Sequence, residues 1–93
     1  MKLYRNSEGK KLYPVCSWEA NQHKLYNAHD RIWCAIYDAE DANEDTSKLY
    51  DELEKCNDAI DAFNRHVING LVYATYEEGQ VIKDYVWAYN ARH

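Results

Sequence analysis

Residues 47–68 read SKLYDELEKCNDAIDAFNRHVI and predict the central helix of the fold. Apolar side chains recur through this stretch in alternating steps of four and three residues: Leu49, Leu53, Cys56, Ile60, Phe63 and Val67. Such a stripe is typical of a helix that packs nearly antiparallel on a neighbour. Thr46 or Ser47 can cap its start. Asn69-Gly70 can end it, because a glycine in the left-handed conformation commonly follows a helix.

A second long helix is predicted over residues 18–39, with Ser17 as its N-cap. Its apolar stripe consists of Leu25, His29, Ile32, Ile36 and Ala39. Residues 40–45 carry no periodic apolar side chain and predict a connecting loop. The two helices should therefore form an antiparallel helical hairpin. The predicted facing pairs are Ile36–Leu53, Ile32–Cys56 and His29–Ile60.

The first sixteen residues predict a β-hairpin. Its turn is Asn6-Ser7-Glu8-Gly9, where the glycine can supply the positive φ that a short hairpin loop needs. Pro14 lies in the second strand. Because proline has no backbone N–H to donate, we expect it on an edge strand or among the final residues of the strand.

The C-terminal part predicts a short strand at 71–75 and a helix at 76–90. Thr75 and Glu78 have the spacing of a capping box, and strand alternation fails from residue 81 onward. The alternative is a second, C-terminal β-hairpin that turns at 77–79. The chain is predicted to be one α+β domain, residues 1–93, with an N-terminal β-hairpin, an antiparallel helical hairpin, a short third strand and a C-terminal helix.

Charge is distributed unevenly along the chain. Residues 38–61 contain ten carboxylates and two lysines, a net charge of −8, whereas residues 1–37 carry +3. A patch of a single sign attracts surfaces of the opposite sign. We therefore predict a partner-binding surface formed by Asp38, Glu40, Asp41, Glu44, Asp45, Asp51, Glu54 and Asp58, with Trp33 and Tyr37 as aromatic contacts. The simpler interpretation is that these carboxylates form a solvated helix face.

The predicted function is that of a small acidic protein-binding module without catalytic activity. It would inhibit or regulate a larger protein by covering a basic, nucleic-acid-binding surface, because carboxylates along a rod can follow the charge of a phosphate backbone. In size and charge, the chain resembles phage-encoded inhibitors of host defence enzymes. The net acidity argues against direct nucleic-acid binding. The alternative is a self-associating domain, such as a homodimer, that uses its nine Tyr and three Trp residues.

Catalytic and metal-binding patterns are weak, so we predict no enzymatic activity, no cofactor and no metal. Residues 38–45 are rich in oxygen ligands but lack the spacing and the glycine of an EF-hand. The three cysteines, Cys16, Cys34 and Cys56, form no CxxC pair. A small metal-binding or cysteine-dependent enzyme is the least favoured alternative.

Cellular location can be predicted from the same cysteines. Their odd number and long spacing do not form a disulfide framework, which indicates a reducing compartment. The N-terminus lacks the apolar segment of a signal peptide, and the apolar run Ile32 to Tyr37 is too short to span a bilayer. We therefore expect a cytoplasmic protein that does not bind membranes.

Overall fold

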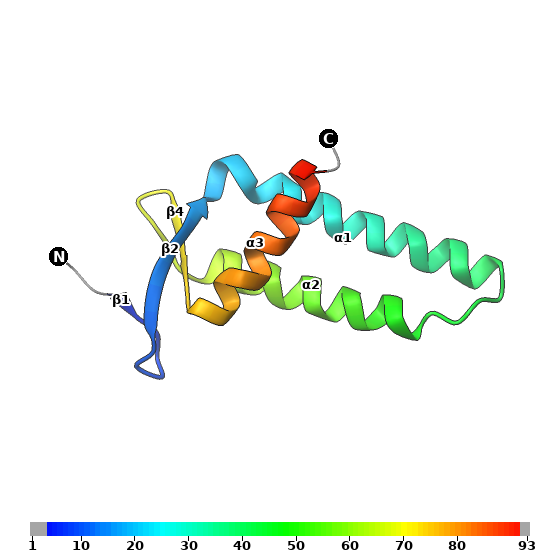
Figure 1. Cartoon of the computed structure of the whole chain (residues 1–93), viewed down its shortest axis with the longest axis horizontal. Coiled ribbons are helices and arrows are strands. Elements are labelled where there is room, and N and C mark those ends of the chain that lie inside the picture. The colour runs from blue at the N-terminus through cyan, green and yellow to red at the C-terminus, as the bar shows by residue number, and fades with distance from the viewer. Residues whose placement is uncertain (1–3, 92–93) are drawn as a thin grey trace.

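The computed structural model describes residues 4–91, and within this range the side chains of residues 4–87. The elements in chain order are β1 (Tyr4–Arg5), β2 (Lys11–Ser17), α1 (Trp18–Asp41), α2 (Ser47–Arg65), β3 (Val67–Ile68), β4 (Leu71–Ala74) and α3 (Tyr76–Ala91). Helices α1 and α2 form a long antiparallel hairpin, the strands gather at its base, and α3 lies across both helices (Figure 1). The predicted α+β class is confirmed.

The four strands form an antiparallel sheet in the order β1-β2-β4-β3. Strand β2 is therefore an inner strand of this order, and Pro14 is the fourth of its seven residues. The prediction that Pro14 lies on an edge strand or among the final residues of its strand is wrong. The described residues of β1 pair only with Lys11 and Leu12, so none of them requires a hydrogen bond from the backbone nitrogen of Pro14. The register with β4 shifts between Pro14 and Cys16, which is the kind of bulge that accommodates proline within a sheet.

A second β-hairpin is present, but it lies before the C-terminal helix rather than at residues 77–79. Helix α2 ends at Arg65, and Val67 belongs to β3, where it is 40% exposed. Asn69 and Gly70 have φ values of 52° and 80° and connect β3 to β4. Positive φ at both central residues is the requirement of a type I′ hairpin turn. The prediction of a helix through residue 68 is thus wrong, because Asn-Gly turns a hairpin here instead of ending a helix.

Two of the predicted helix starts are confirmed by side-chain hydrogen bonds. The Ser17 hydroxyl accepts from the backbone N–H of Ala20 at 3.4 Å at the start of α1. At the start of α3, the Glu78 carboxylate accepts from the Thr75 backbone N–H at 3.2 Å. The Thr75 hydroxyl in turn accepts from the Glu78 N–H at 3.4 Å, which completes the capping box. Local capping chemistry therefore favours a helix at 76–91 over the alternative hairpin.

The buried side chains form two clusters. The larger cluster lies where the sheet meets all three helices and contains Leu25, Ala59, Ala62, Phe63, Val72, Ala74, Ile82 and Val86. The smaller one lies between α1 and α2 and contains Ile32, Ile36, Leu53 and Cys56. This second cluster brings together the residues of the first two predicted pairs. His29 is only half-buried, and its Nδ1 lies 3.8 Å from Asp30 Oδ1.

The molecule is elongated, because the second cluster extends the helical hairpin well away from the sheet (Figure 1). Its extents are 54 × 29 × 16 Å and its radius of gyration is 15.0 Å. A compact chain of this length would have a radius of about 12 Å. We call the projecting part, residues 32–58, the helical arm. All the residues predicted to bind a partner lie on it.

Candidate protein-binding surface

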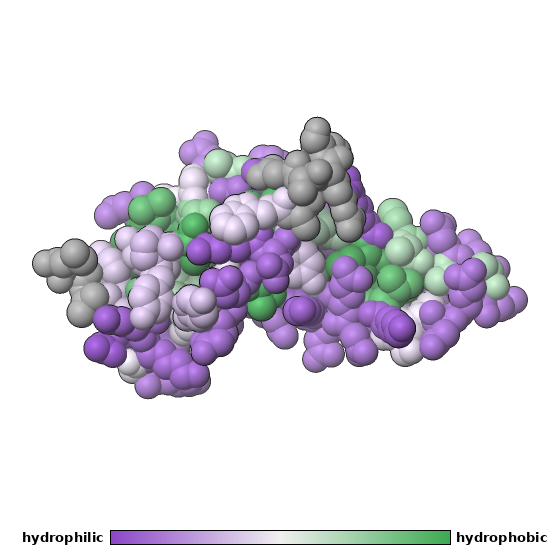
Figure 2. All heavy atoms as spheres, viewed as in Figure 1, coloured by the Kyte–Doolittle hydropathy of each residue, from purple (hydrophilic) through white to green (hydrophobic). Residues whose placement is uncertain are grey.

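All ten carboxylates of residues 38–61 are exposed. In the part of the chain that the structure describes, Lys10 pairs with Glu8, Arg65 pairs with Glu78, and His29 lies close to Asp30. None of these pairs includes a carboxylate of this block, so its negative charge is not neutralised within the described molecule. Figure 2 shows hydrophilic residues over the free end of the helical arm and along α2, with an apolar band between the two helices.

The carboxylates of α2 form a row. Asp51, Glu54 and Asp58 follow one another in steps of three and four residues, and Asp61 continues the row. Residues at this spacing lie on one side of a helix. With a rise of about 1.5 Å per residue, the four carboxylates span about 15 Å along the helix axis.

The carboxylates of α1 lie on two different sides of the helix. Asp38 shares a side with Cys34 and Arg31, where they line a shallow groove of ≈450 Å³ along α1. Asp41, three residues after Asp38, belongs to the same side. Glu40 instead faces α2, where its Oε1 accepts a hydrogen bond from the Tyr50 hydroxyl at 2.9 Å. The predicted residues therefore surround the arm and do not converge on one point.

The loop between the helices has a structural role as well as a charge. The Asp45 carboxylate accepts hydrogen bonds from the Ser47 backbone N–H at 3.0 Å and from the Ser47 hydroxyl at 2.8 Å. The backbone hydrogen bond is the main reason that the pKa of Asp45 is lowered. Thr46 makes no side-chain capping bond, so Asp45 performs the capping role predicted for Thr46 or Ser47. Glu44 has only a backbone contact, from its N–H to the Ala39 carbonyl at 2.8 Å.

Aromatic side chains form a contiguous patch beside Glu40. The rings of Trp33 and Tyr37 stack at 5.6 Å with an interplanar angle of 27°, and Tyr50 meets Trp33 edge-on at 6.2 Å and 88°. Tyr37 is 59% exposed and Tyr50 is 42% exposed. We call Trp33, Tyr37 and Tyr50 the aromatic patch. The structure brings together the two predicted aromatic residues and adds Tyr50, which the sequence reasoning missed.

A signal for Tyr50 was available in the predicted hairpin. It stands one turn into the second helix, close to the loop, and an antiparallel partner places that turn beside the last turns of the first helix. The hydrogen bond to Glu40 raises the pKa of Tyr50, since ionised tyrosine would repel the carboxylate that it contacts.

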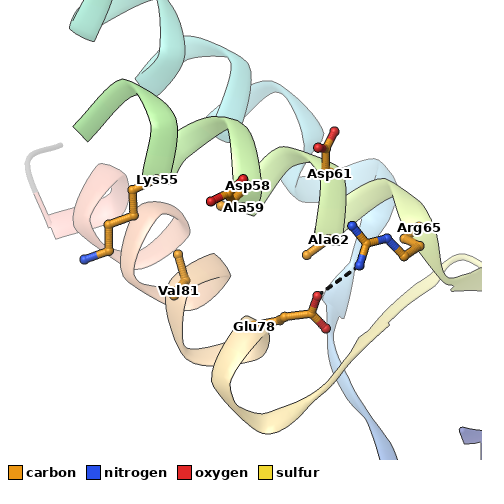
Figure 3. A pocket seen from close by; sticks show the side chains of 8 residues that line it. All are labelled: Lys55, Asp58, Ala59, Asp61, Ala62, Arg65, Glu78 and Val81. Carbon is orange, nitrogen blue, oxygen red and sulfur yellow. Dashed lines mark hydrogen bonds and ion pairs between the residues drawn. The ribbon is translucent and has the colours of Figure 1, made fainter. Parts of the chain in front are cut away.

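A groove of ≈340 Å³ separates the base of α2 from α3, and Asp58 lies at its edge. In Figure 3, Arg65 reaches from α2 toward Glu78 on α3, and the two side chains form an ion pair at 3.2 Å. The other oxygen of Glu78 belongs to the capping box with Thr75. The Arg65–Glu78 ion pair therefore fastens α2 to the start of α3.

The cysteines differ in their surroundings. Cys56 is fully buried, and burial raises the pKa of its thiol to about 11. Cys16 is half-buried, and burial likewise raises its pKa, partly offset by Lys24 and Lys83. Both thiols are protonated at neutral pH and are poor nucleophiles. Cys34 is exposed, and all three are free.

A metal-binding group and a membrane-spanning helix are both absent from the described residues. No group of three or more His, Cys, Asp and Glu side chains within residues 4–91 is placed to hold a metal ion. No helix in this range has the length and apolarity that crossing a membrane requires.

Comparison with protein-family models, with curated proteins and with solved structures finds no match to this chain. The surface of the helical arm is therefore the feature from which a function is proposed.

Proposed function

We propose that the chain is a non-catalytic protein-binding module whose helical arm docks onto a basic surface of a larger protein and blocks nucleic acid from binding there. The observation that carries this proposal is the row of exposed carboxylates, unpaired within the described molecule, on a rod that projects from the fold. Projection matters because a groove that holds nucleic acid admits a narrow element more readily than a flat surface.

The sign of the charge along the arm supports the same proposal. The block of residues 38–61 carries a net charge of −8. From Ser47 to Asp61, helix α2 rises about 21 Å and carries five carboxylates and two lysines, so this part of the helix holds roughly one net charge per 7 Å of axis. Duplex DNA carries one charge per about 1.7 Å. The arm is the less densely charged of the two rods, but its charge has the same sign as that of a duplex, so a groove that attracts a duplex should also attract the arm.

The test compares a variant in which carboxylates of the α2 row are neutralised with a variant in which the same number of carboxylates is neutralised elsewhere. The arm variant is Asp51→Asn, Glu54→Gln and Asp58→Asn, none of which removes a described hydrogen bond or ion pair. The control variant is Glu8→Gln, Glu19→Gln and Asp84→Asn, which changes the net charge by the same amount away from the arm. Both variants and the wild-type chain are used to capture partners from a cell lysate.

A partner that fits the proposal is retained by the wild-type chain and the control variant and lost by the arm variant. It is also displaced by added duplex DNA, and its binding weakens steeply with salt. Equal retention by the arm variant, or binding that duplex DNA leaves unchanged, would refute the proposal.

Self-association is a second candidate function, favoured by exposed aromatic side chains away from the arm. Tyr76 and Trp87 on α3 are 66% and 64% exposed. A dimer that paired two arms would bring two charges of −8 together, so α3 is the more favourable contact. Light scattering over a concentration series tests this candidate, since a monomer at every concentration would exclude it.

A further inference from the structure

The aromatic patch is held in one arrangement before any partner binds. Trp33 contacts the rings of both tyrosines, and the Tyr50 hydroxyl is fixed on the Glu40 carboxylate at 2.9 Å. His29 adds an edge contact to Trp33 at 6.5 Å. Rigid aromatic side chains that are already ordered lose little conformational freedom on binding, and such residues commonly dominate the energy of an interface.

The patch offers binding groups that the described residues do not use. Tyr37 has one ring face stacked on Trp33, yet the side chain remains 59% exposed. The Tyr50 hydroxyl donates to Oε1 of Glu40, and no described residue donates a hydrogen bond to Oε2. In the described part of the chain, Lys83 lies over the ring of Trp87 on α3, 5.8 Å from its centroid and away from the aromatic patch.

These groups together match one kind of side chain. An arginine guanidinium is planar and can stack on an aromatic ring while its N–H groups donate to a carboxylate. A lysine ammonium ion carries the same charge, but it is more strongly hydrated and lacks the flat surface. The negative charge of the surrounding arm would attract either residue, so a preference for arginine over lysine must come from the aromatic patch.

We propose that Tyr37, Tyr50 and Glu40 form a seat for an arginine side chain of the basic partner. This inference rests on the proposed function, since it names the partner group that the arm would recognise. The arginine stacks on the exposed ring of Tyr37, and its N–H groups donate to Glu40. The long-range attraction of the carboxylate row and the short-range contact at the seat are thus separate parts of one surface.

The experiment compares two labelled peptides of equal length and charge, nona-arginine and nona-lysine, by fluorescence anisotropy at about 0.05 M salt, where exposed charges still attract over more than 10 Å. The protein variants are Tyr37→Leu and Tyr76→Leu. Each replaces an exposed tyrosine with an apolar side chain that lacks a π face, and the two original side chains are 59% and 66% exposed. Tyr76 lies on α3 and serves as the matched control. Circular dichroism verifies that each variant is folded.

We expect the wild-type chain to bind nona-arginine about fivefold more tightly than nona-lysine, the size of effect that a single partly desolvated cation–π contact gives. Tyr37→Leu should remove this preference, and Tyr76→Leu should retain it. A preference that persists in Tyr37→Leu, or that is absent from the wild-type chain, would overturn the arginine seat.

The arm variant distinguishes failure of the seat from failure of the proposed function. If both peptides bind equally and both lose affinity when Asp51, Glu54 and Asp58 are neutralised, acidic docking stands and the seat is wrong. If neither peptide binds the wild-type chain, both proposals are wrong.

Discussion

Replacement of Phe63 with alanine tests how the core holds the helical hairpin to the rest of the molecule. Phe63 has no exposed surface, and it lies in the cluster that joins Leu25 of α1, Val72 of β4 and Ile82 of α3. Its ring therefore contacts a core to which three other elements contribute. Removing the ring leaves a cavity that one moving element could not fill alone.

The expected cost follows from this enclosure. Phe→Ala changes in protein cores cost about 3–5 kcal/mol, with larger values where the site cannot collapse. We expect about 4 kcal/mol for Phe63→Ala. A domain of this size is stable by roughly 5–14 kcal/mol, so the change would remove a large part of the total. Each kcal/mol corresponds to about 4–8 °C, so the Tm should fall by at least about 16 °C.

Urea unfolding followed by far-UV circular dichroism measures the change. The urea concentration at the midpoint should fall while the slope stays the same, because the surface area exposed on unfolding would be nearly that of the wild-type chain. Ile60→Ala should cost less, about 2 kcal/mol, because Ile60 is only half-buried. Exposed Asp58→Ala should change stability by no more than about 0.5 kcal/mol. If Asp58→Ala were as damaging as Phe63→Ala, the assignment of the buried side of α2 would be wrong.

Three other predictions concern caps, thiols and alkaline pH. Thr75→Ala should lower the free energy of unfolding by about 1–2 kcal/mol, because it removes the capping box. Thr46→Ala should lower it by less than about 0.5 kcal/mol, because Thr46 makes no capping bond. Equal losses in urea unfolding would contradict the assignment of the caps. A thiol-reactive dye should label the exposed Cys34 first and reach Cys56 only on unfolding. Rapid labelling of Cys56 in the native protein would show that the contact between α1 and α2 opens. Burial raises the pKa of Tyr85 from its ordinary 10.0 to about 12 and that of Cys56 from 9.0 to about 11. Because the unfolded chain loses these protons first, their contribution to stability is full below about pH 9 and is lost as the pH rises through the folded values. Tyr85→Phe should therefore reduce the fall in urea midpoint between pH 10 and 12, and an unchanged fall would exclude Tyr85 as a cause.

The helices could be predicted because their signals are local. The stripe that includes Leu53, Cys56 and Phe63 repeats with the period of a helix, and a side chain on that period must lie on one side whatever surrounds it. The Thr75–Glu78 box likewise needs only residues three apart. These features therefore have the same meaning in the isolated sequence as in the folded protein.

The strands could be predicted only in part, because pairing joins distant residues. Asn69-Gly70 is compatible with a helix end and with a type I′ turn, and the surrounding residues do not decide between them. The hairpin is selected because β4 can then pair with β2, more than fifty residues earlier in the chain. That same pairing encloses β2 and places a bulge at Pro14.

The binding surface shows the same division. Its charge follows from composition, and the exposure of that charge can be predicted because carboxylates without partners stay in water. The projection of the arm, with its row of carboxylates, also needs the helical hairpin to extend past the sheet. The contact of Tyr50 with Trp33 and Glu40, and the use of Asp45 as a cap, depend on how closely α1 and α2 approach. The amino-acid sequence by itself determined the helices and the charge, because periodicity and solvation act locally. The tertiary structure decided the order of the strands, the projection of the arm and the aromatic patch, because each of these is formed by residues that only the folded chain brings together.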